Sequence, residues 1–214
     1  MADSGTPPTP GPQVRRIPTQ RRSIERVERI LNVARQLIAE QGSLNLRMSE
    51  VAEKAEISIG SLYQYFPDRG SIIGALAEHY NAEGRKCVER ELSQVHSMAD
   101  LKAAFETIVD EYHQMYLDEP VMRDLWGATQ VDPQLQALDA ADMQSHTEMM
   151  QKVLLRLFPD QSETELQRVS LLTMQLTATA VRLTLTLDEE EGRALLRTYK
   201  KLVLDNLMAV CTAP

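Results

Sequence analysis

The sequence predicts an all-α protein, with an N-terminal helix-turn-helix domain of three helices followed by a C-terminal helical bundle. Its apolar residues recur at spacings of three and four, which places them along one face of a helix. Only residues 183–187 alternate as a strand does, and because no second strand is evident to pair with them, this segment is expected to be helical. Near the N-terminus two short apolar segments are joined by a three-residue turn, an arrangement typical of a helix-turn-helix.

The first segment, residues 1–20, is predicted to be a disordered tail because it holds five of the chain's ten prolines and almost nothing to bury. The first helix is expected to run from about Ser23 to Gln41. Gly42 can end this helix, since glycine enters the left-handed conformation without strain. The apolar face of the helix consists of Ile24, Val27, Leu31, Ala34 and Ile38.

Two short helices are predicted next, over residues 48–55 and 59–66, with Glu56-Ile57-Ser58 as the turn between them. Ser58 is a good N-cap for the second of these helices, because its hydroxyl can accept a backbone N–H. Asp68 can cap the longer helix that follows it in the same way. We therefore place the helix-turn-helix domain at residues 21–68 and the bundle at residues 69–214.

The rest of the chain keeps a helical rhythm that is interrupted near Pro120, Pro133 and Pro159. The expected helices are one that includes residues 101–115, a short one that carries Trp126, one over 134–158, one opened by a capping box of Ser162 and Glu165, and one from 189 to about 210.

The net charge of −8 is distributed unevenly along the chain. Residues 1–70 carry 10 Lys and Arg against 8 Asp and Glu, whereas the remainder carries 13 against 23. A basic front on an acidic body suggests a local footprint for a polyanion. No run of about 18 apolar residues and no secretory signal is present, so we expect neither a membrane span nor export. The two cysteines, Cys87 and Cys211, lie far apart in the sequence, which fits the cytoplasm and supports no metal site or cofactor.

The turn and the helix after it carry a specific motif. Val51-Ala52, then residues 55–66 (AEISIGSLYQYF), then Arg69 resemble the tetracycline-repressor (TetR) family of bacterial one-component regulators. In that family an Ile/Val-Ala pair, an Ala-Gly-Val-Ser turn, a Gly-x-Leu-Tyr-x-Tyr/His-Phe helix and a following lysine recur. The resemblance covers about residues 24–72 and implies a DNA-binding regulator whose C-terminal helices sense a ligand and dimerise.

Four positions depart from the family pattern. Glu56 replaces the turn glycine, so the turn is expected to be strained or differently wound. Arg47 replaces the threonine that caps the second helix and cannot accept an N–H, so Asn45 is a candidate cap instead. Arg69 replaces lysine with a different charge geometry. Ile59 replaces a basic residue, which favours contact with a thymine methyl group.

The third helix would lie in a major groove about 12 Å wide and present its N-terminal residues to base edges. Gly60 is expected at the closest approach of the backbone to DNA. The other predicted DNA-binding residues are Ser58 at the helix start, Ile59, Ser61 and Gln64 at base edges, and Arg47, Tyr63, Tyr65 and Arg69 at phosphates. For Tyr65 a packed aromatic is an equal alternative, and Leu62, Phe66, Val51 and Ala52 are predicted to be core.

The arginines of the tail have two interpretations. Arg15, Arg16, Arg21 and Arg22 either enter the adjacent minor groove or form a solvated basic tail that attracts DNA nonspecifically. The second interpretation is favoured.

Two C-terminal helices are apolar on more than one face, which predicts that they pair with their symmetry mates in a four-helix dimer interface. The alternative is that both lie in the core of a monomer. The relevant residues are Leu171, Leu172, Met174, Leu176, Ala178, Val181, Leu183 and Leu185 in one helix, and Leu195, Leu196, Tyr199, Leu202, Val203, Leu207 and Val210 in the other.

A ligand pocket could be lined by aromatic, Met and His side chains, which give adaptable apolar walls with a few polar groups. Met and aromatic residues at helical spacing are more often ordinary core than pocket, and this is the favoured interpretation for each residue alone. The acidic body could favour a cationic or neutral effector, although charge on solvated faces says little about a pocket. The candidates are Tyr112, His113, Tyr116, Trp126, Met143, His146, Met150 and Met174.

The sequence does not predict an enzyme. Asp110-x-x-His113 and Asp142-x-x-x-His146 each place a carboxylate and an imidazole on one helical face, but the further ligands of a di-iron site are missing. No phosphate loop, nucleophile elbow or HExxH motif is found. These pairs are expected to be exposed or locally hydrogen-bonded.

Together with these observations, the resemblance implies a cytoplasmic, homodimeric transcriptional repressor that binds a near-palindromic double-stranded operator and is released from it by a small molecule. The alternative is an all-α interaction or scaffold protein whose helix-turn-helix does not bind DNA.

Overall fold

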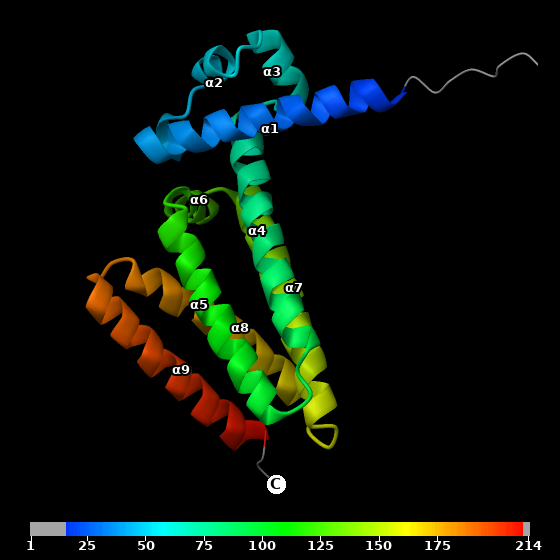
Figure 1. Cartoon of the computed structure of the whole chain (residues 1–214), viewed down its shortest axis with the longest axis vertical. Coiled ribbons are helices and arrows are strands. Elements are labelled where there is room, and N and C mark those ends of the chain that lie inside the picture. Colours follow the sequence, from blue (N-terminus) through cyan, green and yellow to red (C-terminus); the bar gives the residue numbers. More distant parts are fainter. Residues whose placement is uncertain (1–15, 212–214) are drawn as a thin grey trace, which may run out of the picture.

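Nine α-helices and one short 3-10 helix make up the described part of the chain, residues 16–211 of this computed structural model, and no strand occurs within it (Figure 1). The all-α prediction is confirmed, and the 183–187 segment is the end of a helix followed by a turn. The elements are α1 (Arg16–Gln41), η1 (Ser43–Asn45), α2 (Met48–Lys54), α3 (Ile59–Tyr65), α4 (Arg69–Ser93), α5 (Met98–Asp118), α6 (Val121–Thr129), α7 (Pro133–Leu157), α8 (Glu163–Thr184) and α9 (Glu189–Cys211).

The first helix begins earlier than expected. α1 starts at Arg16, so residues 16–20 are helical and the predicted boundary of the disordered tail at residue 20 is wrong. Pro18 explains the difference, because a proline in the first turn of a helix removes an N–H that has no helical partner there. The prediction of disorder for residues 1–15 lies outside the described residues, as does the placement of Arg15.

The three N-terminal helices share one small core. Leu62 and Phe66 of the α3 segment and Val51 and Ala52 of α2 are buried, together with apolar residues of α1 such as Ile30. The prediction that these four residues form core is confirmed. Because these side chains occupy the inner side of α3, its opposite side is left at the surface.

The turn between α2 and α3 has a defined hydrogen-bond pattern. The N–H of Glu56 donates to the Glu53 carbonyl at 3.0 Å, and the N–H of Ile57 donates to the Ala52 carbonyl at 3.0 Å. These two bonds form a Schellman motif, which requires a left-handed residue just after the helix. Glu56 supplies it with φ of 55°, the one positive φ at a non-glycine residue in the described chain. The expected strain at this position is therefore present.

Two of the expected helix caps form and two do not. The Ser58 hydroxyl accepts the N–H of Ser61, and Asp68 forms a capping box with Ser71. Asn45 does not cap α2, because its side-chain amide donates instead to the carbonyl of Gln41 at the end of α1. The capping box predicted at Ser162 is also absent, since the Ser162 side chain accepts no N–H at the start of α8.

The C-terminal helices build an elongated bundle around α5 (Figure 1). α4 runs from the N-terminal domain down the length of the bundle with α7 beside it, and α8 packs against both α7 and α9. The core between them contains Leu101, Phe105, Val109, Met150 and Leu154, none of which is more than 1% exposed. Because α4 belongs to both parts, the orientation of α4 sets the position of α2 and α3.

We expect the substitution Glu56→Gly to raise the free energy of unfolding by about 0.5–1 kcal/mol, because glycine has no Cβ penalty in the left-handed conformation. Urea denaturation followed by circular dichroism measures the change. Glu53→Gly, at an exposed position within α2, is the matched control and should lower stability by up to about 1 kcal/mol. Equal destabilisation by both substitutions would contradict the strain at Glu56.

Candidate nucleic-acid interface and ligand cavity

The outer side of α3 is exposed. Ile59 is 43% and Tyr63 51% exposed, and Ser58 and Gln64 also lie at the surface. At Gly60 the surface is bare, since a Cβ built there would meet no heavy atom within 4 Å. A short helix with one apolar buried side and one free side has the shape that enters a major groove.

The remaining predicted DNA contacts are placed differently. Arg47 is exposed at the start of α2, and its side chain caps no N–H of that helix. The Arg69 guanidinium, by contrast, donates to the carbonyl of Leu44 at 2.5 Å. Arg69 therefore stabilises the loop before α2 through a hydrogen bond inside the domain. Ser61 is half-buried with its hydroxyl 3.0 Å from that of Ser58, and half-buried Tyr65 packs against the core, as its alternative interpretation expected.

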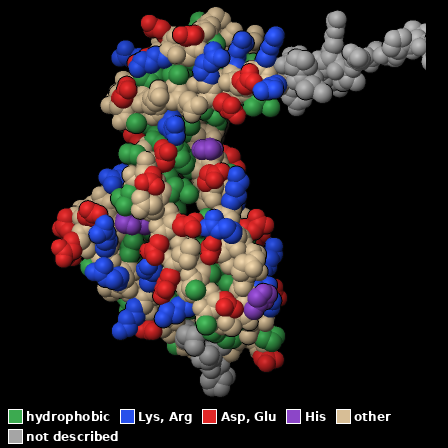
Figure 2. Space-filling view, in the orientation of Figure 1, with side chains coloured by type: hydrophobic (Ala, Val, Ile, Leu, Met, Phe, Trp, Pro, Cys, Tyr) green, Lys and Arg blue, Asp and Glu red, His purple; other side chains and the backbone are tan. Residues whose placement is uncertain are grey.

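Basic side chains are spread over the N-terminal domain, with carboxylates among them (Figure 2). On α1, Arg21, Arg22, Arg26 and Arg29 are all exposed, and Arg21 is paired with Glu25 at 3.0 Å. The uneven charge of the sequence thus appears at the end of the molecule that carries α3.

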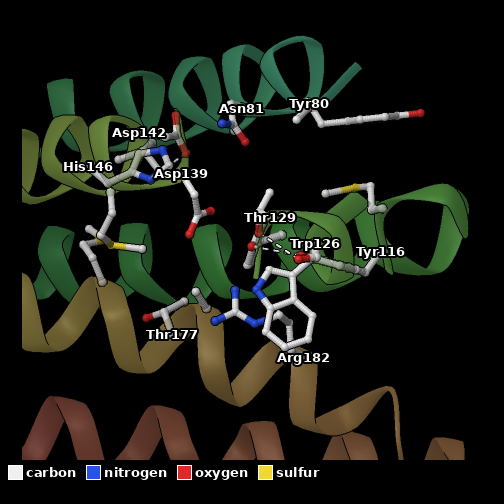
Figure 3. A pocket seen from close by; sticks show the side chains of 18 of the residues that line it. Tyr80, Asn81, Tyr116, Trp126, Thr129, Asp139, Asp142, His146, Thr177 and Arg182 are labelled. Carbon is white, nitrogen blue, oxygen red and sulfur yellow. Dashed lines mark hydrogen bonds and ion pairs between the residues drawn. The ribbon is translucent and has the colours of Figure 1, made fainter. Parts of the chain in front are cut away.

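A cavity of about 100 Å³ lies in the other part of the molecule, among α4, α5, α6, α7 and α8 (Figure 3). Six of the eight predicted pocket residues line it: Tyr112, Tyr116, Trp126, Met143, His146 and Met174. Two do not. Met150 is completely buried in the core, and His113 faces the side of α5 near Asp110 and the α9 residues Arg193 and Lys200.

Most of the polar residues that line the cavity were not predicted from the sequence. Arg182 from α8, Asn81 from α4 and Thr177 from α8 all line it. The guanidinium carbon of Arg182 lies 4.6 Å from the centroid of the Trp126 ring, close enough for a cation–π contact. The available signal was the position of Arg182, the one charged residue among the apolar and threonine residues 176–187, because a charge in such a stretch needs a polar neighbour.

The Asp142–His146 pair was predicted to be exposed or locally hydrogen-bonded. Neither residue is exposed, so the first of these alternatives is wrong. The Asp142 carboxylate is ion-paired with the Arg85 guanidinium, and its second oxygen lies 3.7 Å from Nδ1 of His146. Burial raises the pKa of Asp142 to about 6, although the Arg85 pair opposes this shift. Burial and the charge of Arg85 lower the pKa of His146 to about 4. The imidazole is therefore neutral at pH 7, and its buried Nε2 atom has no hydrogen-bond partner among the residues that the structure describes.

Burial keeps two tyrosines of the cavity, Tyr112 and Tyr80, in the un-ionised form. Tyr112 and Tyr116 contact edge to face, with ring centroids 5.3 Å apart. Burial raises the pKa of Tyr112 well above its usual value, and burial together with a hydrogen bond to Glu119 raises the pKa of Tyr80 to about 12. Their hydroxyl groups can donate hydrogen bonds at any physiological pH.

The two parts of the molecule meet at α6. The N–H of Ser43 in η1 donates to the Asp124 carboxylate at 2.8 Å. At the preceding end of α5, the Glu119 carboxylate accepts hydrogen bonds from Arg35 of α1 at 3.2 Å and from the Tyr80 hydroxyl at 2.9 Å. The same short helix that carries Trp126 into the cavity therefore contacts the N-terminal helix-turn-helix domain directly.

Several leucines remain exposed at the far side of the bundle. Leu172, Leu176 and Leu183 form one stripe along α8 and are 59%, 49% and 48% exposed, and Leu202 of neighbouring α9 is 57% exposed. We refer to these four residues as the leucine stripe. The side chain of Val210, part of the predicted dimer helix, lies outside the described residues. No helix in the described range is long and apolar enough to span a membrane.

These features define a class of protein, in which a helix-turn-helix domain is joined to a helical domain that encloses a cavity. The family model described as "Bacterial regulatory proteins, tetR family" matches residues 30–76, and the model "Tetracyclin repressor-like, C-terminal domain" matches residues 99–211. The chain belongs to the tetracycline-repressor (TetR) family, a family of DNA-binding transcriptional regulators.

Individual relatives agree with this assignment. The chain is 35% identical over 75 residues to the HTH-type transcriptional repressor KstR of Rhodococcus jostii, a match that covers 31% of this chain and 35% of that protein. A TetR-family regulator from Pectobacterium atrosepticum has the same fold, with a TM-score of 0.67 at 20% identity over 91% of this chain and 98% of that one. The regulator FadR of Bacillus subtilis, solved in complex with stearoyl-CoA, also has this fold. The TM-score is 0.66 at 13% identity, and the match covers 83% of this chain and 97% of that one.

The low pKa of His146 predicts a pH effect on stability. A folded-state pKa of about 4 lies below the value of about 6.5 in the unfolded chain, so the native state resists protonation as pH falls between these values. Stability relative to a His146→Asn variant is expected to fall by up to about 3 kcal/mol between about pH 7 and pH 4. Urea denaturation of both proteins across this range measures the difference in their free energy of unfolding. Asp142 has the opposite pH effect, but both proteins retain it, so its contribution to the difference largely cancels. A pH-independent difference would show that His146 is solvated.

Proposed function

We propose that the protein is a homodimeric repressor that binds a near-palindromic operator through α3 and leaves it when a small molecule enters the cavity. The observation that carries this proposal is the pairing of a bare α3 face with a cavity whose wall, α6, is bonded to the DNA-binding domain. The FadR relative with bound stearoyl-CoA supports ligand control of such a fold. The proposal assigns no catalytic activity, and it places the protein in the cytoplasm with the chromosome.

On DNA, the N-terminal end of α3 would face the bases. The backbone at Gly60 can approach the groove without a side chain between them, and Gln64 can form a bidentate pair with adenine. Ile59, Ser61 and Ser58 flank this position, and Ile59 suits a thymine methyl group. Tyr63 and Arg47 would contact phosphates, which position the helix without specifying sequence, while Arg69 keeps the loop in place.

The dimer would form through the leucine stripe. Apolar side chains that stand exposed along one side of a helix are typical of an interface with another copy. Pairing α8 and α9 with their symmetry mates would bury these leucines in a four-helix arrangement. Two α3 helices would then be set about one turn of DNA apart, about 34–36 Å.

Release of DNA would follow from movement of α6. A ligand that contacts Trp126 acts on the same helix whose Asp124 holds Ser43. A coupling free energy of about 1–3 kcal/mol between the two sites is enough to shift operator occupancy five- to 150-fold.

The interface on α3 is tested by Gly60→Leu. Because the position is open, the variant should fold normally, but its side chain would hold α3 away from the bases and weaken binding at least about tenfold. A salt-controlled gel shift on the DNA upstream of the protein's own gene measures binding. Gly127→Leu on α6, where a Cβ also meets nothing within 4 Å, is the matched control and should bind normally.

Tyr63→Ala should also weaken operator binding while leaving the thermal unfolding curve close to that of the wild-type protein. If no DNA fragment is retarded by the wild-type protein, the scaffold alternative is supported. Wild-type affinity in both α3 variants would refute this orientation of the helix.

The dimer is tested by Leu176→Glu. Two symmetry-related leucines would be lost from the interface. The dimer should therefore be destabilised by about 4 kcal/mol, which raises its dissociation constant about a thousandfold. Sedimentation equilibrium over a range of concentrations measures this. Val131→Glu, in the turn between α6 and α7 and 76% exposed, is the control and should remain dimeric. A dimer that survives Leu176→Glu would place the interface elsewhere.

A further inference from the structure

We infer that the cavity binds a small aromatic carboxylate, with the acid group held by Arg182 and the ring held beside Trp126 and Tyr112. The inference rests on the proposed function, because it names the ligand class of the same cavity. It follows from an arginine without a counter-ion, from the size and walls of the cavity, and from the placement of its acidic groups.

Arg182 is the cation available to a ligand. Its guanidinium lies over Trp126, and within the described range it has no carboxylate at ion-pair distance. A half-buried guanidinium that is not paired with an anion keeps hydrogen-bond donors available to a ligand. Its planar donor edge matches a carboxylate, and its face can stay stacked on the indole while that edge binds.

The walls around Arg182 suit one aromatic ring. Tyr112, Trp126, Met143 and Met174 surround the space with aromatic and thioether surfaces. A volume of about 100 Å³ is smaller than the 150 Å³ or so of an apolar cavity known to bind benzene, so a ligand with several rings or a long chain would require the helices to separate.

The acidic groups of the cavity lie on the opposite side. Figure 3 shows Asp139, Asp142 and His146 together near α4 and α7, across from Arg182 on α8. Asp142 already has the Arg85 guanidinium as its partner, so it does not need a cationic ligand. Asp139 would repel an anionic group placed on its side. This arrangement directs the ligand's carboxylate toward Arg182 and leaves the ring between the two sides.

Binding is tested with benzoate, its neutral isostere benzamide and the cation benzylamine. Trp126 is the chain's single tryptophan, so its fluorescence reports on this cavity alone. In titrations of the full-length protein without DNA, we expect benzoate to bind at least about tenfold more tightly than either other probe. Equal affinity for benzamide, tighter binding of benzylamine, or no benzoate binding up to about 10 mM would overturn the inference.

Variants then locate the acid group. Arg182→Gln should lose at least about tenfold in benzoate affinity with benzamide affinity unchanged, and Arg182→Lys should recover part of the loss. Arg168→Gln, an exposed arginine on the same helix, is the control and should bind benzoate as the wild type does. Calorimetry gives these affinities independently of the indole signal. Unchanged benzoate affinity in Arg182→Gln would refute the role of Arg182.

Failure of this inference can be told apart from failure of the proposed function. Titrations are made on the free protein, whereas operator binding is measured by gel shift without any probe. Octanoate, a single-chain acid, is the remaining probe: if it binds more tightly than benzoate, Arg182 still selects an anion but the aromatic part of the inference is wrong.

Discussion

The hydrogen bond from the N–H of Ser43 to the Asp124 carboxylate is the constraint on which the two-part architecture depends. It anchors the connection between α1 and α2 on α6, and the backbone there is shaped for it. Gly42 has φ of 83°, and a Cβ at that position would lie 3.2 Å from the second oxygen of Asp124. A side chain at Gly42 would therefore be strained by its backbone and crowded by its partner. The glycine that ends α1 also makes room for α6.

The consequence is a short mechanical path between the cavity and the DNA-binding domain. Asp124 and Trp126 are two residues apart on α6, and a rigid two-turn helix transmits a shift at one to the other. Glu119 adds a second tie by binding Arg35 of α1 and Tyr80 of α4. A charge-assisted hydrogen bond contributes about 1.5–3 kcal/mol, which matches the coupling that a regulator needs. Loss or rearrangement of one such bond is thus sufficient for a response.

Local features of the fold could be predicted from the sequence because they depend on residues close together in the chain. The buried side of α3 and its cap at Ser58 follow from spacings of three or four residues, whereas strain at Glu56 was expected from the resemblance to the TetR family, whose turn has a glycine there. The predicted cap at Asn45 failed although its partner is also local. The side-chain amide of Asn45 is a donor and bonds to the carbonyl of Gln41, four residues earlier, instead of accepting an N–H at the start of α2. Other failures depend on distant partners.

The predictions for the cavity also succeeded where they depended on local pattern and failed where they depended on packing between helices. His113 directly follows Tyr112, and one residue turns a helix by 100°, which moves the imidazole from the cavity to the neighbouring face. Met150 lies one turn beyond His146 on the same face, but there the neighbouring helices close over it. Periodicity identifies the inward face of a helix and cannot locate where along that face the helices stand apart. Arg182 was missed for a related reason, since its partner Trp126 lies more than 50 residues away in the sequence.

The composition of the cavity wall argues that it is more than a gap in the packing. The chain has ten aromatic residues, and Tyr80, Tyr112, Tyr116 and Trp126 line this one space. Tyr112 and Tyr116 add hydroxyl groups to the wall, where leucine would pack without a polar atom to satisfy, whereas the Tyr80 hydroxyl donates to Glu119. The net negative charge of the bundle has little bearing here, because its carboxylates lie mostly on solvated faces, where water and salt screen them. Within the cavity the local field is set by Arg182 on one side and by Asp139, Asp142 and Arg85 on the other. A bundle folded for stability alone has no need of that separation, whereas a site that must orient a polar ligand does.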